Sequence, residues 1–445
     1  MTIKEISIAQ LREGMYICEL DLPWIKNPFF RSKLLVKNSS EINQLKSAGC
    51  KTLKIDTSQG ADIADNPDTP ASGSTPNQAT PEPIDTESAA TAITAEKNVA
   101  TKPVEASKGS PKPAETPQLI KRPQTPSASI EDFNSKQKAA LVIRNQTISA
   151  INEINSQIVR GNPIKQEQLL PLVDTMIAEL NENEQAMLAS LNIQSNQGLL
   201  NAHLYNTMTL VLSAAPSITD DIKEMMLLGQ AALLHDIGWT KLPGYMIQKG
   251  RPFTPQEKKL EKQHVDLSLA KLKAFPDIPE RVLALVAAHH EMPNGKGYPR
   301  GLKDNSLDKG CRLLSIAIRY DELTHALFDN IGMLPAKAMK QLFKEALAGN
   351  FDQKLVSAFI HLLGVYPIGS AVKLSDNSKG VIVHHQPDSP LKPQILKYYD
   401  SDGKVLTAPR LLDTKVIEGL EISGFVDSNN PQDDPAGLLR VNSEA

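Results

Sequence analysis

Between about residues 60 and 130 the chain carries almost no large apolar side chains and is rich in Pro, Ala, Thr and Ser. A segment of this composition cannot bury enough apolar surface to offset the conformational entropy that folding would remove. We therefore expect a disordered linker over residues 59–130. Such a linker excludes one continuous core for the 445-residue chain, which must fold as separate units on either side.

The residues before this linker predict a small α+β module over 1–58. The runs IKEISIAQL and KTLKIDT alternate apolar and polar residues, as half-buried strands do. Between them, SSEINQLKSAG predicts a helix that begins at a serine N-cap and stops at Gly49.

The residues after the linker predict a helical domain followed by short strands. From 131 to 362, apolar residues recur at three- and four-residue spacing, which predicts one helical bundle. Residues 363–428 hold the runs AVKLS, GVIVHH and QILKYYD and predict a small β domain, while 429–445 predict a loose tail. The predicted fold class is multidomain and mainly α, with a small N-terminal α+β module and a small C-terminal β segment.

The overall composition excludes several classes of function. With 48 Lys+Arg against 51 Asp+Glu and 4% aromatic residues, the chain lacks the basic surface and the stacking platform of a general nucleic-acid binder. Its three cysteines are too few and scattered for a disulfide framework, which favours a reducing compartment. Because we find no signal peptide and no run of about 18 apolar residues, we expect a cytoplasmic protein without a membrane span.

Five of the nine histidines fall on separate predicted helices or at their ends, and one of them precedes an aspartate. The candidate metal ligands are His203, His235, Asp236, His264, His289 and His290. Neutral imidazoles donate one nitrogen each, and a carboxylate can bridge two cations that clamp a phosphoryl group. A single histidine on an apolar helix is more often a packed core residue, but the adjacent pairs together favour a metal site.

The segment NGKGYP, which follows the histidine pair closely, predicts a tight turn. In such a turn Gly295 and Gly297 would tolerate positive φ, and Pro299 would fix the exit of the chain. The same loop is suited to close contact with a ligand, to which it would offer the Tyr298 ring. The two interpretations are compatible, because a turn can carry a binding loop.

The motifs around these residues resemble those of the HD-GYP subfamily of the HD phosphohydrolases. LLHDIGW is similar to the family's HDxGK segment, HHEMPNGKGYPRGL to its HHExxDGxGYPxGL, and IAIRYDELT to its VADxYDALT. The likeness spans about residues 190–350. In addition, LREGMYICELDLPWIKNPF resembles a domain of unknown function that often precedes HD-GYP domains, and YPIGSAVKLS resembles the β segment that often follows them.

This resemblance implies a bacterial cyclic di-GMP phosphodiesterase with two or three divalent cations, often iron or manganese. Carried over residue by residue, it places one cation on Asp236, His264, His289 and His290, and a second on His203, His235 and Asp236. The candidate catalytic residues are Asp236, Lys241 and Lys249, and the candidate substrate-binding residues are Gly295, Gly297, Tyr298 and Arg251.

Ile318, Trp239 and Asn294 depart from the family pattern, and Leu199 stands where some members add a Glu ligand. Ile318 stands where the family has its closing metal Asp, whereas Asp321 matches the second Asp of that motif, which is not the usual ligand. Trp239 replaces a Lys that is a candidate for phosphate contact, and Lys241, two residues on, is a candidate substitute. Because loss of an anionic ligand weakens one cation most, we expect two cation positions, one of them weakened or empty.

Three functions are compatible with this pattern. The first is hydrolysis of cyclic di-GMP to linear pGpG and then GMP, which the retained ligands favour. The second is a degenerate sensor or adaptor that binds cyclic di-GMP, or a protein such as a diguanylate cyclase, without turnover; Ile318, Trp239 and Asn294 favour it. The third is an interaction protein whose histidines are only core residues. Turnover of cyclic di-GMP by the metal-loaded protein separates the first from the others.

Overall fold

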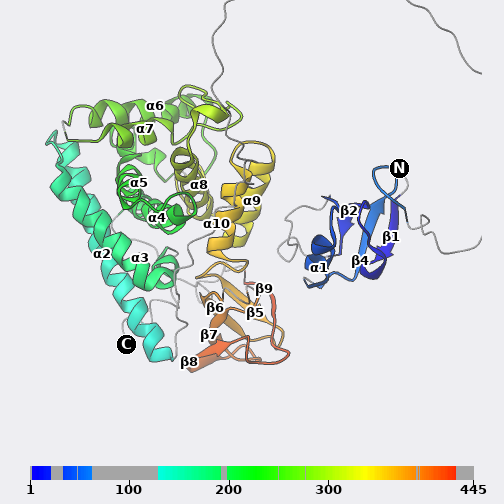
Figure 1. The fold of residues 1–445 in the computed structure, drawn as a ribbon. Coiled ribbons are helices and arrows are strands. Elements are labelled where there is room, and N and C mark those ends of the chain that lie inside the picture. The colour runs from blue at the N-terminus through cyan, green and yellow to red at the C-terminus, as the bar shows by residue number, and fades with distance from the viewer. Residues whose placement is uncertain are drawn as a thin grey trace, which may run out of the picture. The chain divides into compact units, whose positions relative to one another are not determined.

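The computed structural model describes residues 3–21, 34–47, 49–62, 129–191 and 198–426, apart from 249, 276, 387, 388 and 390. The chain divides into two units, Met1–Ala114 and Glu115–Ala445, and each is described by itself (Figure 1). The predicted tail 429–445 lies outside the described residues, as does the predicted linker 59–130 except for its first four and last two residues.

The described part of the N-terminal unit is an antiparallel sheet with strand order β1-β4-β2-β3, together with one α-helix. Its elements are β1 (Ile3–Ser7), β2 (Tyr16–Leu20), β3 (Leu34–Leu35), α1 (Ser39–Ser47) and β4 (Thr52–Asp56). Leu45 of α1 packs with Ile17, Leu53 and Ile55 of the strands in one buried cluster. Gly49, at φ +85°, follows the helix, as the sequence predicts. The predicted α+β character of this region is confirmed.

The second unit begins with a helical bundle built around α4 (Figure 1). Its helices are α2 (Ile130–Val159), α3 (Gln166–Ser190), α4 (Leu199–Ala214), α5 (Ile222–Leu234), α6 (Pro255–Leu272), α7 (Glu280–Ala288), α8 (Lys309–Thr324), α9 (Pro335–Leu347) and α10 (Gln353–Leu363). Helix α4 packs against α2, α3, α5, α8 and α10 and is buried along nearly its whole length, polar residues such as His203 and Asn206 included. In the part of the chain that the structure describes, no helix combines the length and apolar character needed to cross a bilayer.

A five-stranded antiparallel sheet follows the bundle, with strand order β8-β7-β6-β5-β9. Its strands are β5 (Ala371–Leu374), β6 (Lys379–His384), β7 (Gln394–Tyr399), β8 (Val405–Asp413) and β9 (Ile422–Phe425). The sequence predicts β5, β6 and β7. Phe133 of α2 joins the apolar cluster of β6 and β7, and Gln185 of α3 accepts a 2.7 Å hydrogen bond from the backbone N–H of His385. The predicted mainly α fold with small β regions at both ends is confirmed.

Candidate metal centre

The ends and faces of four helices converge on one buried cluster of imidazoles around an aspartate. His203 lies within α4, His235 and Asp236 follow α5, His264 lies within α6, and His289 and His290 follow α7. All are buried except His290, which is partly exposed. Gly238 permits the convergence, because a Cβ at this position would collide with the backbone of α6 at His264.

Asp236 lies between two sets of imidazoles. Its Oδ2 is 3.5 Å from His203 Nε2 and 3.6 Å from His235 Nε2. Its Oδ1 is 3.2 Å from His264 Nε2 and 3.7 Å from His289 Nε2. The inner set is His203, His235 and Asp236, and the outer set is Asp236, His264, His289 and His290; in each, the ligand atoms lie within 4.8 Å of one another. One carboxylate is thus placed to bridge two cations.

The hydrogen bonds behind the imidazoles fix their tautomers. Three rings donate Nδ1–H to a backbone carbonyl: His235 to Ala232 (2.9 Å), His264 to Glu261, and His289 to Val286 (2.6 Å). Their Nε2 atoms therefore carry lone pairs. His203 Nε2 is 3.2 Å from His235 Nε2, and His264 Nε2 is 3.0 Å from His289 Nε2. Lone pairs this close repel unless a cation or a proton lies between them, so the donor set fits metal ions.

The charge state of the cluster fits the same conclusion. Burial lowers the pKa of His289 to about 4, and it lowers the pKa of His235, His264 and His290 well below its ordinary value. Neutral imidazole is the form that coordinates metal. Burial also raises the pKa of Asp236 to about 7, and among the described residues its Oδ1 accepts no hydrogen bond. A cation would supply the partner that this buried oxygen lacks.

His203 differs from the other imidazoles because a carboxylate, and not a carbonyl, lies behind its ring. Its Nδ1 is 2.6 Å from Asp321 Oδ2. The other oxygen of Asp321 is 2.8 Å from Asn206 Nδ2 and 2.9 Å from His325 Nδ1. With both oxygens engaged, Asp321 orients an imidazole in place of binding a cation itself. The ring of His325 contacts Asp321, Thr324 and Leu191 and, among the described residues, none of the candidate ligands.

A cavity of about 320 Å³ opens beside the outer set. Its wall includes His289, His290 and Ile318, the last only 1% exposed. Four cationic side chains line it: Lys258, Lys262, Lys296 and Arg319. Lys258 and Arg319 are already paired with carboxylates, whereas Lys262 and Lys296 form no ion pair among the residues that the structure describes. The wall also holds Glu261, Glu291, Glu322 and Glu345, so its formal charges balance, and Lys262 and Lys296 are the cations that lack a carboxylate partner among the described residues.

The loop after His290 is held by its own polar side chains. Both oxygens of Glu291 accept backbone N–H groups, from Arg300 at 2.7 Å and Leu302 at 2.8 Å. Asn294 accepts the N–H of Lys296 at 2.9 Å, so it closes the turn as an Asp would. This places the Tyr298 ring, which lines the cavity, parallel to His290 with centroids 4.7 Å apart.

The two glycines of this loop have different roles. Gly295 has the predicted positive φ, at +75°. The same prediction for Gly297 is wrong, because Gly297 is not among the glycines with positive φ. Its lack of a side chain serves close packing, since a Cβ would collide with the backbone of His290, Glu291 and Met292.

Trp239 fills one side of the cluster with apolar surface. It is 2% exposed and stacks on Phe328, with centroids 4.2 Å apart, and on His264 at 5.2 Å. Phe328 in turn meets His203 edge-on at 5.9 Å. The inner set is thus covered by aromatic rings, whereas the outer set faces the cavity through His289 and His290.

Residues 171–355 match the family described as HD domain, and residues 3–169 match the family described as Domain of unknown function (DUF3391). The chain contains an HD domain behind a DUF3391 domain. These matches confirm the resemblance on which the sequence predictions rest.

Several known proteins are similar to this chain. Cyclic di-GMP phosphodiesterase PA4108 of Pseudomonas aeruginosa is 24% identical over 412 residues, which are 92% of this chain and 89% of that protein. Cyclic di-GMP phosphodiesterase PdeB of Borreliella burgdorferi is 24% identical over 204 residues, 46% of this chain and 53% of that protein. Among solved structures, Bd1817, described as an HDG"Y"P protein from Bdellovibrio bacteriovorus, matches 81% of this chain and 99% of its own at a TM-score of 0.43 and 16% identity.

The HD domain does not bring all the predicted site residues together. The six predicted ligands, with Tyr298, lie around one centre. Lys241 and Arg251 are exposed, and neither lines the cavity; the Arg251 guanidinium is 3.8 Å from Glu257. Lys249 lies outside the described residues. Gly295 and Gly297 shape the loop that carries Tyr298.

Sequence reasoning missed other residues of the HD domain that border the centre. Lys258 and Lys262 lie one helical turn apart on α6, just before His264, so their four-residue spacing was an available signal. His325 stands four residues after Asp321 at the end of α8, so the same spacing was an available signal for their ion pair.

Proposed function

We propose that this protein is a metal-dependent phosphodiesterase that hydrolyses cyclic di-GMP to linear pGpG and then to GMP. The observation that carries the proposal is the position of Asp236 between the inner and outer sets, beside a cavity lined by Lys262 and Lys296, which form no ion pair among the described residues. Relatives named as cyclic di-GMP phosphodiesterases, one of them aligned over 92% of this chain, support the choice of substrate.

The cofactors that we propose are two divalent cations, iron or manganese. Bound cations polarise a phosphoryl oxygen and lower the pKa of an attacking water. The outer position binds more tightly than the inner one, because four of the described side chains serve it and three serve the inner position. The apolar Ile318 adds no ligand in the place where the resemblance leads one to expect a carboxylate.

The residues of the cavity bind and orient the substrate. Lys262 and Lys296 hold the two phosphates by charge, and Tyr298 packs against the dinucleotide while His290 supports its ring. Burial raises the pKa of Tyr298 well above its ordinary value, so its hydroxyl stays a hydrogen-bond donor. In the reaction the water oxygen bonds to phosphorus, the P–O3′ bond breaks, and the 3′ oxygen leaves with a proton.

A second candidate function is a cyclic di-GMP receptor that acts on a partner protein, such as a diguanylate cyclase, without turnover. The observation that favours it is the apolar character of two positions at the centre. Ile318 offers no ligand, and the Trp239 ring occupies the side of the cluster where the resemblance places a phosphate-contacting Lys.

The test is turnover of cyclic di-GMP by the purified full-length protein, reconstituted anaerobically with Fe²⁺ or Mn²⁺, with products separated by chromatography. We expect pGpG and GMP from the wild type, and neither from the His235→Ala/Asp236→Ala protein. Asp266→Asn, an exposed change on α6, is the matched control and should keep wild-type turnover. Binding of cyclic di-GMP without product from folded, metal-loaded wild type would reject the enzyme and leave the receptor.

A further inference from the structure

We propose that Asp321 and His325 are positioning residues that hold His203 for the inner cation and so set the affinity of the inner position. The inference rests on the proposed metal centre and adds two residues that coordinate nothing themselves. The side chains of His203, Asp321 and His325 contact one another in that order, from the inner set to the end of α8.

The first step is the contact between Asp321 and His203. At 2.6 Å, Asp321 Oδ2 accepts the Nδ1 proton of His203. This contact leaves the Nε2 lone pair of His203 facing His235 Nε2 at 3.2 Å and Asp236 at 3.5 Å. A ligating histidine is commonly held by a carboxylate in this way, and the carboxylate also raises the basicity of the ring.

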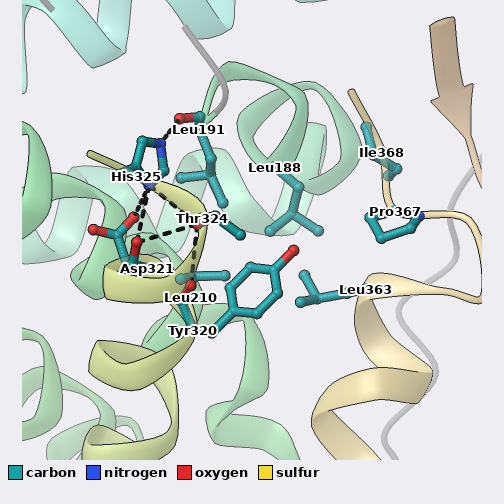
Figure 2. A pocket seen from close by; sticks show the side chains of 10 residues that line it. All are labelled: Leu188, Leu191, Leu210, Tyr320, Asp321, Thr324, His325, Leu363, Pro367 and Ile368. Atoms are coloured by element: carbon teal, nitrogen blue, oxygen red, sulfur yellow. Dashed lines mark hydrogen bonds and ion pairs between the residues drawn. The ribbon is translucent and has the colours of Figure 1, made fainter. Parts of the chain in front are cut away.

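The second step is the environment of His325, shown in Figure 2. Its Nδ1 lies 2.9 Å from Asp321 Oδ1 and 3.1 Å from Thr324 Oγ1, and its Nε2 lies 3.0 Å from the carbonyl oxygen of Leu191. Both ring nitrogens face acceptors, so both must carry protons, and the ring is an imidazolium. A cation therefore lies behind Asp321 and keeps this fully buried carboxylate ionised.

The inner position depends strongly on the orientation of His203. Three of the side chains that the structure describes serve this position, and His203 is the one that α4 contributes. The other two residues, His235 and Asp236, belong to one turn of chain. An error in the orientation of His203 would therefore leave the inner cation with ligands from a single segment, whereas the outer set draws on α6 and on the end of α7 independently.

The experiment is a Mn²⁺ titration of the metal-free full-length protein, in which the EPR signal of free Mn²⁺ reports binding. The variants are Asp321→Asn, His325→Gln and the double variant. The matched controls are the exposed substitutions Asp266→Asn and His361→Gln, which should bind as wild type does.

In wild type we expect two steps, the tighter at the outer set. Asp321→Asn should weaken the second step about 10- to 100-fold, as loss of an outer carboxylate does elsewhere, and leave the first unchanged. His325→Gln should weaken the same step about three- to tenfold, because it removes the charge but not every hydrogen bond. The double variant should be no worse than Asp321→Asn, since His325 acts only through Asp321.

Several results would overturn the proposal. They are a single Mn²⁺ step in wild type, an unchanged second step in Asp321→Asn, equal weakening of both steps, or additive effects in the double variant. If Asp321→Asn does not fold, the His325→Gln protein alone tests the proposal. An unchanged second Mn²⁺ binding step in that protein would then reject it. Cyclic di-GMP turnover is measured separately, so two intact Mn²⁺ steps without turnover would reject the proposed enzyme and not this inference.

Discussion

Replacing His325 with Gln should make the stability of the protein less dependent on pH between about 6.5 and 9. Burial alone would lower the pKa of His325, but the charge and hydrogen bonds of Asp321 outweigh it and raise the pKa to about 9. A group whose pKa is raised on folding contributes stability that is fully present below its unfolded pKa, near 6.5, and is lost as the pH rises through 9.

The size of this effect follows from the two pKa values. A rise from 6.5 to about 9 corresponds to at most about 3.5 kcal/mol, at roughly 1.4 kcal/mol for each tenfold change in the proton equilibrium. The side chain of His325 is 31% exposed, so water screens part of the interaction with Asp321. We therefore expect about 1–2 kcal/mol.

The assay is urea unfolding of the metal-free wild type and His325→Gln at pH 6 and pH 9.5. All other groups titrate in both proteins, so the difference between them isolates His325. The wild type should exceed the variant by about 1–2 kcal/mol more at pH 6 than at pH 9.5. The exposed substitution His361→Gln should show no such difference. A gap that stays constant with pH, or widens as pH rises, would refute the reasoning.

Three further changes test the centre and its cavity. Ile318→Asp should destabilise the metal-free protein by about 3 kcal/mol or more, because it removes a buried apolar side chain and buries a carboxyl group. In thermal unfolding, Mn²⁺ should raise the Tm of this variant by more than it raises the Tm of wild type. An equal rise in the two proteins would count against a cation near this position. Lys262→Met should raise KM for cyclic di-GMP about tenfold with little change in kcat. The exposed control Lys259→Met on the same helix should change neither constant. If the two variants have the same KM, Lys262 does not bind the substrate. Trp239→Phe keeps an aromatic ring beside Phe328, but it leaves a cavity and removes the indole N–H that interacts with the Asp236 carboxylate, so urea unfolding should show a loss of about 1–3 kcal/mol, and an unchanged stability would contradict this packing.

The sequence was informative where one local pattern decides the outcome. Helical periodicity sufficed for the bundle, and the adjacent pairs at 235–236 and 289–290 sufficed for most of the ligand set, because neighbouring residues at a helix end stay together whatever the tertiary packing. The turn at Asn294 was also predictable, since an Asn side chain closes such a turn as well as an Asp does.

The sequence was uninformative where the rotation of one helix against another decides which side chains face the metal centre. Asp321 and Glu322 are adjacent on α8, yet Asp321 meets His203 and Glu322 faces the cavity. Lys241 was a reasonable substitute for a missing lysine, but the short helical turn that carries it leaves its side chain exposed. Strands β8 and β9 escaped prediction because their pattern of burial is weak, as expected at the two edges of a sheet.

The contact of Phe133 with β6 and β7 bears on how this protein can be divided. Phe133 stands near the start of α2, the first helix of the bundle, while its partners belong to the sheet that follows the last helix. A chain truncated after α10 would leave Phe133 without its apolar neighbours, and the sheet grafted onto another protein would lack a residue of its own core. The sheet therefore cannot be removed or exchanged by itself. A recombination event that transfers the sheet would also have to transfer α2 and all the residues encoded between them.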